Sequence, residues 1–199
     1  MSASTISGSI IILGTFLFIC LIVFLTFDNH VETLGKCMKY FKVLNKEDAE
    51  KASDVLCELD SRIIKFIKYI KQKYVNDKKM QEKIGRLESN YHSSDLHESE
   101  AETFTINKGE KIMLCIRNPH TGKFFSINTL MFVVLHEITH MMLRDYHTGD
   151  HPMEYWKLND IVLRDAEEAG VYQNIDYRYH PVEYCNGIII NNNPRFSLS

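Results

Sequence analysis

The sequence carries no strong charge of either sign, because 23 Lys and Arg side chains stand against 26 Asp and Glu, for a formal net charge of −3. Domains that bind nucleic acid are usually strongly basic, so this balance gives no support for a nucleic-acid partner. The sequence also lacks a Cys-x-x-Cys pair, and its five cysteines are odd in number. We therefore predict neither a disulfide framework nor a cysteine zinc site.

The N-terminal segment has no charged side chain in residues 1–27, and the run from Gly8 to Phe27 is almost entirely apolar. A helix of this length rises about 30 Å, which matches the hydrocarbon core of a bilayer. A cleaved signal peptide is the main alternative, but residues 1–7 lack the basic segment that such peptides carry. The sequence therefore predicts one transmembrane helix over residues 8–27.

The nearest basic side chains follow this apolar run, at Lys36, Lys39, Lys42 and Lys46, and no lysine or arginine precedes it. Lysine and arginine favour the cytoplasmic side of a membrane. We therefore expect a single-pass membrane protein whose residues 28–199 lie in the cytosol.

Hydrophobic periodicity predicts the elements that follow. Apolar side chains recur at three- and four-residue steps over residues 45–74, which indicates a long amphipathic helix, and a shorter helix is expected over 78–87. The polar, acidic stretch 88–102 is typical of a loop. Residues 103–107 and 111–117 are typical of two strands in a small sheet, which either covers the core or holds an extended peptide at its edge.

The pattern His136-Glu137-x-x-His140 lies in an apolar run that predicts a helix beginning at Thr129, with Asn128 as its N-cap. Histidines four residues apart share one helical face, so both imidazoles can reach one metal ion while the glutamate stands beside the attacking water. Two ordinary, partly buried histidines are the alternative. The pattern favours a hydrolytic zinc site with Glu137 as its general base.

A catalytic zinc needs a third protein ligand and leaves a fourth position for water. His151 immediately precedes a predicted helix over residues 152–169, and a ligand fixed by a helix is better positioned than one in a loop. His147 is the alternative, and His180 is a more remote candidate. The predicted zinc ligands are therefore His136, His140 and His151.

These residues resemble the WLM and SprT-like zinc metallopeptidases, whose members include proteases that cut DNA–protein crosslinks. The similarity is strongest to short metallopeptidase-like proteins of large DNA viruses. Such proteins share three further blocks with this sequence, at Thr105–Cys115, Asn128–Val133 and Ile175–Cys185. The resemblance covers about residues 45–190, and the blocks together are fairly specific.

The resemblance implies an α+β fold, in which a zincin-like metallopeptidase domain with a small β-sheet and an HExxH active-site helix follows the transmembrane helix. The expected organisation is a short N-terminal tail, the transmembrane helix, a juxtamembrane linker, a metallopeptidase-like domain and a C-terminal tail. These segments are placed at residues 1–7, 8–27, 28–44, 45–190 and 191–199.

The expected function is that of a membrane-anchored zinc-dependent endopeptidase acting on a protein or peptide substrate, with the membrane contacted through the N-terminal helix. The alternative is a non-proteolytic, zinc-stabilised binding module at a membrane. Glu137 favours catalysis, because a purely structural zinc site needs no general base. Crosslink repair is implied by the resemblance, but the membrane segment and the near-neutral charge argue against steady contact with DNA. The sequence makes no prediction of the oligomeric state.

Overall fold

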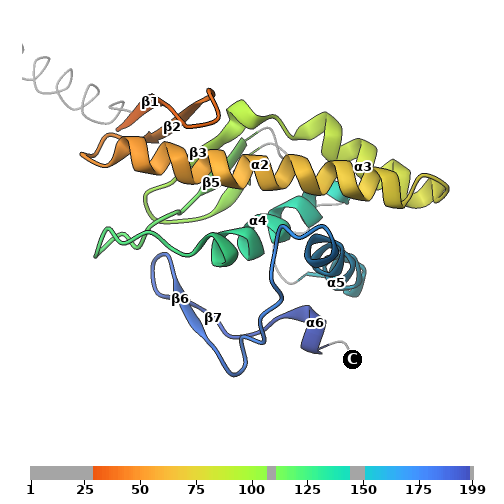
Figure 1. The fold of residues 1–199 in the computed structure, drawn as a ribbon. Coiled ribbons are helices and arrows are strands. Elements are labelled where there is room, and N and C mark those ends of the chain that lie inside the picture. Colours follow the sequence, from red (N-terminus) through yellow and green to blue (C-terminus); the bar gives the residue numbers. More distant parts are fainter. Residues whose placement is uncertain (1–28, 107–110, 144–150, 198–199) are drawn as a thin grey trace, which may run out of the picture. The chain divides into compact units, whose positions relative to one another are not determined.

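A computed structural model of the chain describes residues 29–106, 111–143 and 151–197 (Figure 1). The chain divides into two compact units, residues 1–30 and 31–199. Of the first unit, the structure describes residues 29 and 30.

The predicted transmembrane helix requires correction. Within the residues that the structure describes, no helix is both long and apolar enough to cross a membrane. The longest of them, α2 (Ala49–Lys73), carries lysine, arginine and acidic side chains along its length, which hydrocarbon would not accommodate. The predicted span 8–27 itself lies outside the described residues. The expected fold of a transmembrane helix followed by a domain, and the single-pass localisation that depended on it, are therefore not supported.

The helices of the domain lie close to their predicted positions. Helix α2 is followed by α3 (Lys78–Asn90), and the chain turns back so that α3 lies beside α2 (Figure 1). Asp77 caps α3 by accepting a hydrogen bond from the Met80 amide at 3.0 Å, which satisfies one of the free donors at the helix start.

Helix α4 (Ile127–Met142) carries the His-Glu-x-x-His pattern and begins two residues before its predicted start. Ser126 is its N-cap and accepts a hydrogen bond from the Thr129 amide at 3.0 Å. Asn128, the predicted cap, instead exchanges two hydrogen bonds with the backbone of Gln173, and so ties α4 to the C-terminal segment.

Helix α5 (Met153–Glu168) follows, with Pro152 at its N-cap. It ends before Gly170, whose φ of +66° is the left-handed conformation that glycine adopts most readily after a helix. The predicted helix over 152–169 is therefore confirmed to within one residue at each end.

A three-stranded sheet has the order β3 (Leu96–Glu98), β5 (Lys111–Leu114), β4 (Phe104–Ile106). Strand β3 pairs with β5 in parallel, and β4 pairs with β5 in antiparallel fashion. The loop predicted over 88–102 is wrong at β3, whose three residues are all buried. The polar composition was misleading because the Glu98 carboxylate has buried partners: Arg117 donates to it at 2.6 Å and the Leu44 amide at 2.8 Å.

Residues 30–44 also differ from the expected linker. They form strands β1 (His30–Leu34) and β2 (Tyr40–Leu44), which pair as a two-stranded sheet. The side chains of Phe41, Val43 and Leu44 are buried in the core. This segment therefore belongs to the packed domain.

The C-terminal segment forms a hairpin of β6 (Val182–Tyr184) and β7 (Ile188–Ile190) around Gly187, followed by the short helix α6 (Pro194–Ser197). The structure joins Cys115 to Cys185 and Cys37 to Cys57 in disulfides, which corrects the expectation of no disulfide framework. The partners lie 70 and 20 residues apart, a pairing that the spacing of cysteines in the sequence does not reveal.

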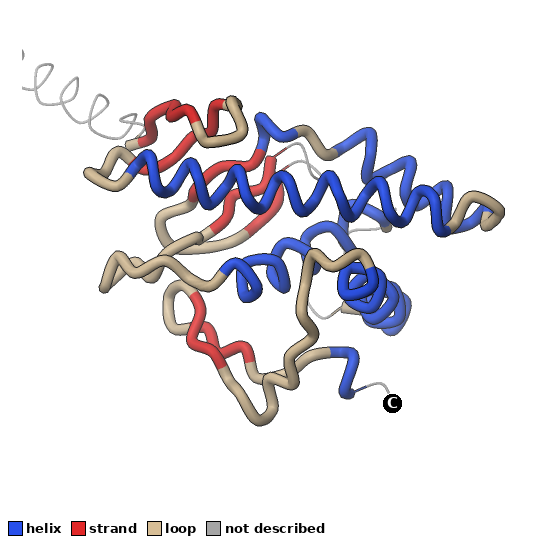
Figure 2. Tube along the Cα trace, viewed as in Figure 1, coloured by secondary structure: helices blue, strands red, loops and turns tan. Residues whose placement is uncertain are grey.

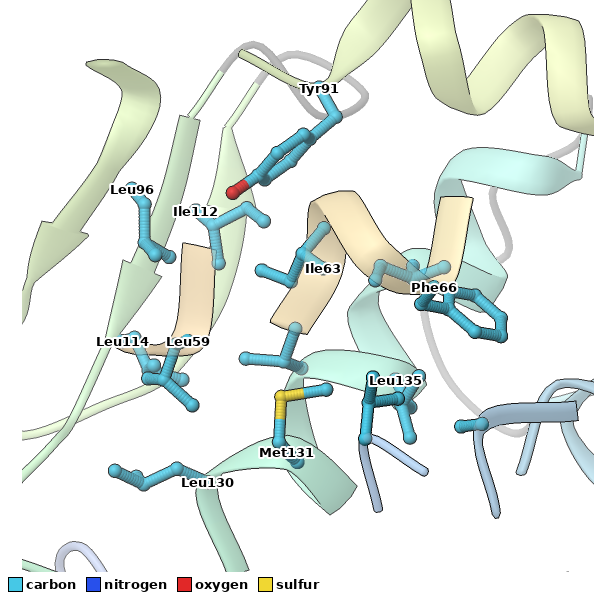
Figure 3. Packing of buried hydrophobic residues seen from close by; sticks show 14 of the residues in the cluster. Leu59, Ile63, Phe66, Tyr91, Leu96, Ile112, Leu114, Leu130, Met131 and Leu135 are labelled. Atoms are coloured by element: carbon cyan, nitrogen blue, oxygen red, sulfur yellow. The ribbon is translucent and has the colours of Figure 1, made fainter. Parts of the chain in front are cut away.

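The core forms where α2, the sheet and α4 meet, and Figure 2 shows these helices and strands along the chain trace. Figure 3 shows apolar side chains from the three elements packed in one cluster, among them Leu59, Ile63, Phe66, Leu96, Ile112, Leu114, Leu130, Met131 and Leu135. Burying one such side chain contributes about 1.5–3 kcal/mol. This packing fixes α4, and with it the two histidines on the side of α4 that faces α5.

Candidate metal centre

Helix α4 brings His136 and His140 together, one turn apart on the same face. Their ring centroids are 5.0 Å apart, and both side chains are half-buried. The flanking residues Leu135, Ile138 and Met141 are buried in the core. The apolar face of the helix is thus fixed by packing, and the two imidazoles point away from it.

His151 completes a group of three imidazoles. It stands directly before Pro152 at the start of α5, and its Nε2 atom lies 2.9 Å from the Nε2 atom of His140. Its ring centroid is 4.9 Å from that of His136. One nitrogen of each ring lies within 4.8 Å of the others, and no second group of three or more potential ligands of this kind occurs in the described part of the chain.

His147 and His180 are the other two candidates for the third ligand. His147 lies outside the described residues. His180 is exposed and does not belong to the group of imidazoles.

The surroundings keep the imidazoles of His136 and His140 neutral. Burial, and then the charges of His140 and His151, lower the pKa of His136 from 6.5 to about 3. Burial and then the charge of His151 lower the pKa of His140 to about 4. A neutral imidazole offers a nitrogen lone pair, which is the form that binds a metal ion.

The geometry fits a zinc ion. Nitrogen ligands about 2.0–2.1 Å from a tetrahedral zinc stand about 3.3–3.4 Å from one another. The nitrogen separations here, 2.9 Å between His140 and His151 and at most 4.8 Å within the group, are compatible with that value. Three imidazoles are also a common ligand set for zinc.

Glu137 lies on the same turn of α4 and is 8% exposed. Burial raises the pKa of its carboxyl from 4.5 to about 7, although a hydrogen bond with Thr105 of strand β4 acts in the opposite direction. A carboxyl group with a pKa near neutrality can both accept and donate a proton. The contact with Thr105 places the edge of the sheet beside this carboxyl group.

Two aromatic residues next to the histidines were not predicted to contact them. The Tyr155 hydroxyl donates to the His136 carbonyl oxygen at 3.1 Å, and its ring lies against all three imidazoles. Trp156 is half-buried, and its ring lies 5.1 Å from the His151 ring between centroids. The available signal was their position, four and five residues after the third histidine.

The sequence offers Tyr177, Tyr179, His180 and Tyr184 of the C-terminal segment as a second electrophile, although packing or surface exposure is the better expectation for each. In the structure Tyr177 is buried and His180 is exposed. The Tyr184 hydroxyl is already engaged, because it donates to the Cys115 carbonyl oxygen at 2.8 Å and lies 2.6 Å from the Thr103 hydroxyl. Tyr179 is 76% exposed. Neither side chain has the free, inward-facing hydroxyl that this role requires.

The fold and the site together define an α/β domain with a three-histidine cluster that could bind a metal ion. A sequence model of the WLM domain matches residues 36–183, which is most of the chain. The chain belongs to the WLM domain family. The family resemblance noted in the sequence is therefore confirmed.

Several viral proteins are similar in sequence to this chain. Uncharacterized protein R325 of Acanthamoeba polyphaga mimivirus is 28% identical over 156 residues, which cover 76% of this chain and 77% of that protein. Uncharacterized protein 042R of Invertebrate iridescent virus 3 is 38% identical over 71 residues, or 36% of this chain and 42% of that protein. Uncharacterized protein 136R of Invertebrate iridescent virus 6 is 33% identical over 72 residues, which cover 35% of this chain and 38% of that protein. This chain thus matches less than half of each iridescent-virus protein.

Two crystal structures from Saccharomyces cerevisiae, those of Wss1 and of a Wss1 mutant, are also similar to the chain. Each is 20% identical, and each match covers 72% of this chain and 97% of the yeast chain. The TM-scores are 0.46 for Wss1 and 0.47 for the mutant.

Proposed function

We propose that this chain is a zinc-dependent endopeptidase. The observation that carries the proposal is the meeting of three imidazoles, from His136, His140 and His151, beside the buried carboxyl group of Glu137. Membership of the WLM family supports the same conclusion, because the resemblance to that family implies a metallopeptidase.

In this proposal His136, His140 and His151 hold the zinc ion, which when bound supplies a Lewis acid for the peptide carbonyl and lowers the pKa of a coordinated water. Glu137 accepts a proton from the attacking water and passes it to the amine that leaves when the C–N bond breaks. Burial supports both steps, since it raises the pKa of this carboxyl group to about 7. The neutral imidazoles of His136 and His140 remain available as ligands throughout.

The substrate we propose is an extended segment of a protein or peptide. Among the described residues, β4 is an end strand of its sheet and pairs with β5 alone. The backbone on its other side can form hydrogen bonds with an added strand. Thr105 of β4 contacts Glu137, so a segment added to this edge would run beside the proposed general base.

The experiment compares the purified protein with Glu137→Gln on an unfolded protein substrate. The substitution keeps the size of the side chain and removes its proton-accepting group, so we expect zinc binding to persist while cleavage falls about 10²–10⁴-fold. Glu167→Gln, an exposed glutamate on α5, is the matched control and should cleave normally.

The same experiment tests the alternative of a zinc-stabilised binding module. Such a module would bind zinc in both variants and cleave no substrate in either. Equal cleavage by the wild type and by Glu137→Gln would contradict the proposed role of this residue.

A further inference from the structure

The three imidazoles come from two different helices. His136 and His140 are spaced by α4 alone, whereas His151 reaches them only if the start of α5 is held at the correct position along α4. What fixes the position of α5 therefore decides whether the third nitrogen meets the other two.

Two polar contacts, one helical turn apart, join the helices at this point. The Tyr155 hydroxyl donates to the His136 carbonyl oxygen at 3.1 Å. One turn further along α5, the Asn159 amide donates to the Thr139 hydroxyl at 2.9 Å, and that hydroxyl donates to the Leu135 carbonyl oxygen at 2.8 Å. Tyr155, Asn159 and Thr139 are each at most 2% exposed, so sliding α5 along α4 would leave buried polar groups without partners.

The ring of Tyr155 is also the common neighbour of the imidazoles. Its centroid lies 4.1 Å from that of His151, 4.6 Å from that of His140 and 5.2 Å from that of His136. The Trp156 ring lies 5.1 Å from that of His151 between centroids and meets the Tyr155 ring edge-on at 5.2 Å. The position of His151 is thus restricted by aromatic contacts as well as by the helix.

We propose that Tyr155 is a positioning residue for the three-histidine site: its ring supports the imidazoles, and its hydroxyl fixes α5 to the turn of α4 that carries His136. The proposal rests on the proposed function, in which these histidines hold zinc. Tyrosine has a single hydroxyl hydrogen, and this one is donated to a backbone carbonyl. The hydroxyl hydrogen is therefore not available to a substrate, and in this proposal Tyr155 acts through the ligands.

The test measures zinc affinity of the full-length protein by competition with a chelator, for Tyr155→Leu and Tyr155→Phe. Outer residues that orient metal ligands typically contribute about 10–100-fold to metal affinity. We expect Tyr155→Leu, which loses ring and hydroxyl, to weaken zinc binding by about this factor, and Tyr155→Phe, which keeps the ring, to weaken it less. The visible absorption of the Co²⁺-loaded protein should change in Tyr155→Leu, because it reports the geometry of the ligands.

Tyr91→Leu and Tyr91→Phe are the matched controls. Tyr91 is also a buried tyrosine, 8% exposed, and its hydroxyl donates to Asp60 at 2.7 Å. Loss of its ring should lower the melting temperature of the apoprotein and leave the zinc affinity and the Co²⁺ spectrum unchanged. If Tyr155 served stability alone, its variants would likewise lower the melting temperature and leave the zinc affinity and the Co²⁺ spectrum unchanged.

A folded Tyr155→Leu protein with wild-type zinc affinity and an unchanged Co²⁺ spectrum would overturn the proposal. If circular dichroism shows that Tyr155→Leu is unfolded, Tyr155→Phe decides the question: weaker zinc binding supports the proposal, and wild-type affinity with an unaltered spectrum overturns it. Failure of the wild type to bind zinc would instead refute the proposed function, so the two failures are distinguishable.

Discussion

At the scale of single residues, the identity of the third ligand is the assignment with the greatest consequence. His151 lies 2.9 Å from His140 between Nε2 atoms and is surrounded by Tyr155 and Trp156. We expect His151→Ala to weaken zinc binding by more than about 100-fold, since even residues behind the ligands contribute 10–100-fold. His147→Ala should bind zinc as the wild type does. Chelator competition measures both, and the reverse pattern would show that His147 is the ligand.

The histidines also predict a pH dependence for the apoprotein. The folded chain lowers the pKa of His136 from 6.5 to about 3, so the unfolded chain takes up a proton at higher pH than the folded chain does. The stability that depends on neutral His136 is complete above about pH 6.5 and is lost as the pH falls toward about 3. The free energy of unfolding at about pH 5 should be lower than that at about pH 7.5 by up to about 2 kcal/mol.

Urea unfolding of the zinc-free protein at about pH 7.5 and about pH 5 measures this loss. His136→Gln cannot take up the proton and should show a smaller loss, whereas His180→Gln, at an exposed position, should behave as the wild type does. An identical loss in the wild type and in His136→Gln would contradict the assignment.

At the scale of elements, a buried charge network joins the sheet to the start of α2. Arg117, 2% exposed, donates to Glu98 of β3 at 2.6 Å and also pairs with Asp48, the N-cap residue of α2. Arg117→Ala leaves the Glu98 carboxylate buried without its cation, and we expect a loss of about 3–5 kcal/mol in the free energy of unfolding. Arg178→Ala, at an exposed arginine paired with Asp176, should lower the free energy of unfolding far less. Denaturant unfolding compares the two, and equal losses would contradict the structural role of Arg117.

The two disulfides predict a count of reactive thiols. Four of the five cysteines are paired in the structure, which leaves Cys20. Alkylation of the denatured protein without reductant should therefore modify a single thiol, and alkylation after reduction should modify all five. Mass spectrometry gives both numbers. Five modified thiols before reduction would show that the cysteines do not pair in the purified protein.

How far the sequence predicts these elements depends on whether their signal is local. The helix over 152–169 and the histidine-bearing helix α4 were predicted, because periodicity and a terminal glycine are properties of neighbouring residues. Strand β3 was missed, because the burial of Glu98 depends on Arg117, a residue 19 positions away. The linker expected over 28–44 was wrong for a similar reason, since its strands are recognised only by their packing on the core.

The residues of the candidate site also differ in whether a local sequence pattern reveals them. His136, Glu137 and His140 follow from the spacing on one helix, which is a local pattern. His151 required a choice between histidines, and the structure gives its distance from the other two. For Tyr155 the signal was only its position four residues after His151, and Asn159 had no recognisable signal, because the importance of both depends on how α5 packs against α4.

At the scale of the whole molecule, the proposed site depends on several parts of the chain at once. Helix α4 supplies two imidazoles and the buried carboxyl group, α5 is preceded by the third imidazole, and β4 contributes Thr105 beside the carboxyl group. The core holds α2, α4 and the sheet together. The membership of the WLM family extends over residues 36–183 and so includes all of these parts.

The central claim is that zinc held by this arrangement makes the chain an endopeptidase. The most direct measurement strips the metal from the purified protein, adds zinc stepwise, and follows both bound zinc and cleavage of an unfolded protein. We predict that cleavage rises in proportion to bound zinc and stops rising at a single zinc ion per chain, while Glu137→Gln binds the same amount without cleavage. Cleavage that persists in the metal-free protein, or full zinc occupancy of the wild type with no cleavage, would contradict the claim.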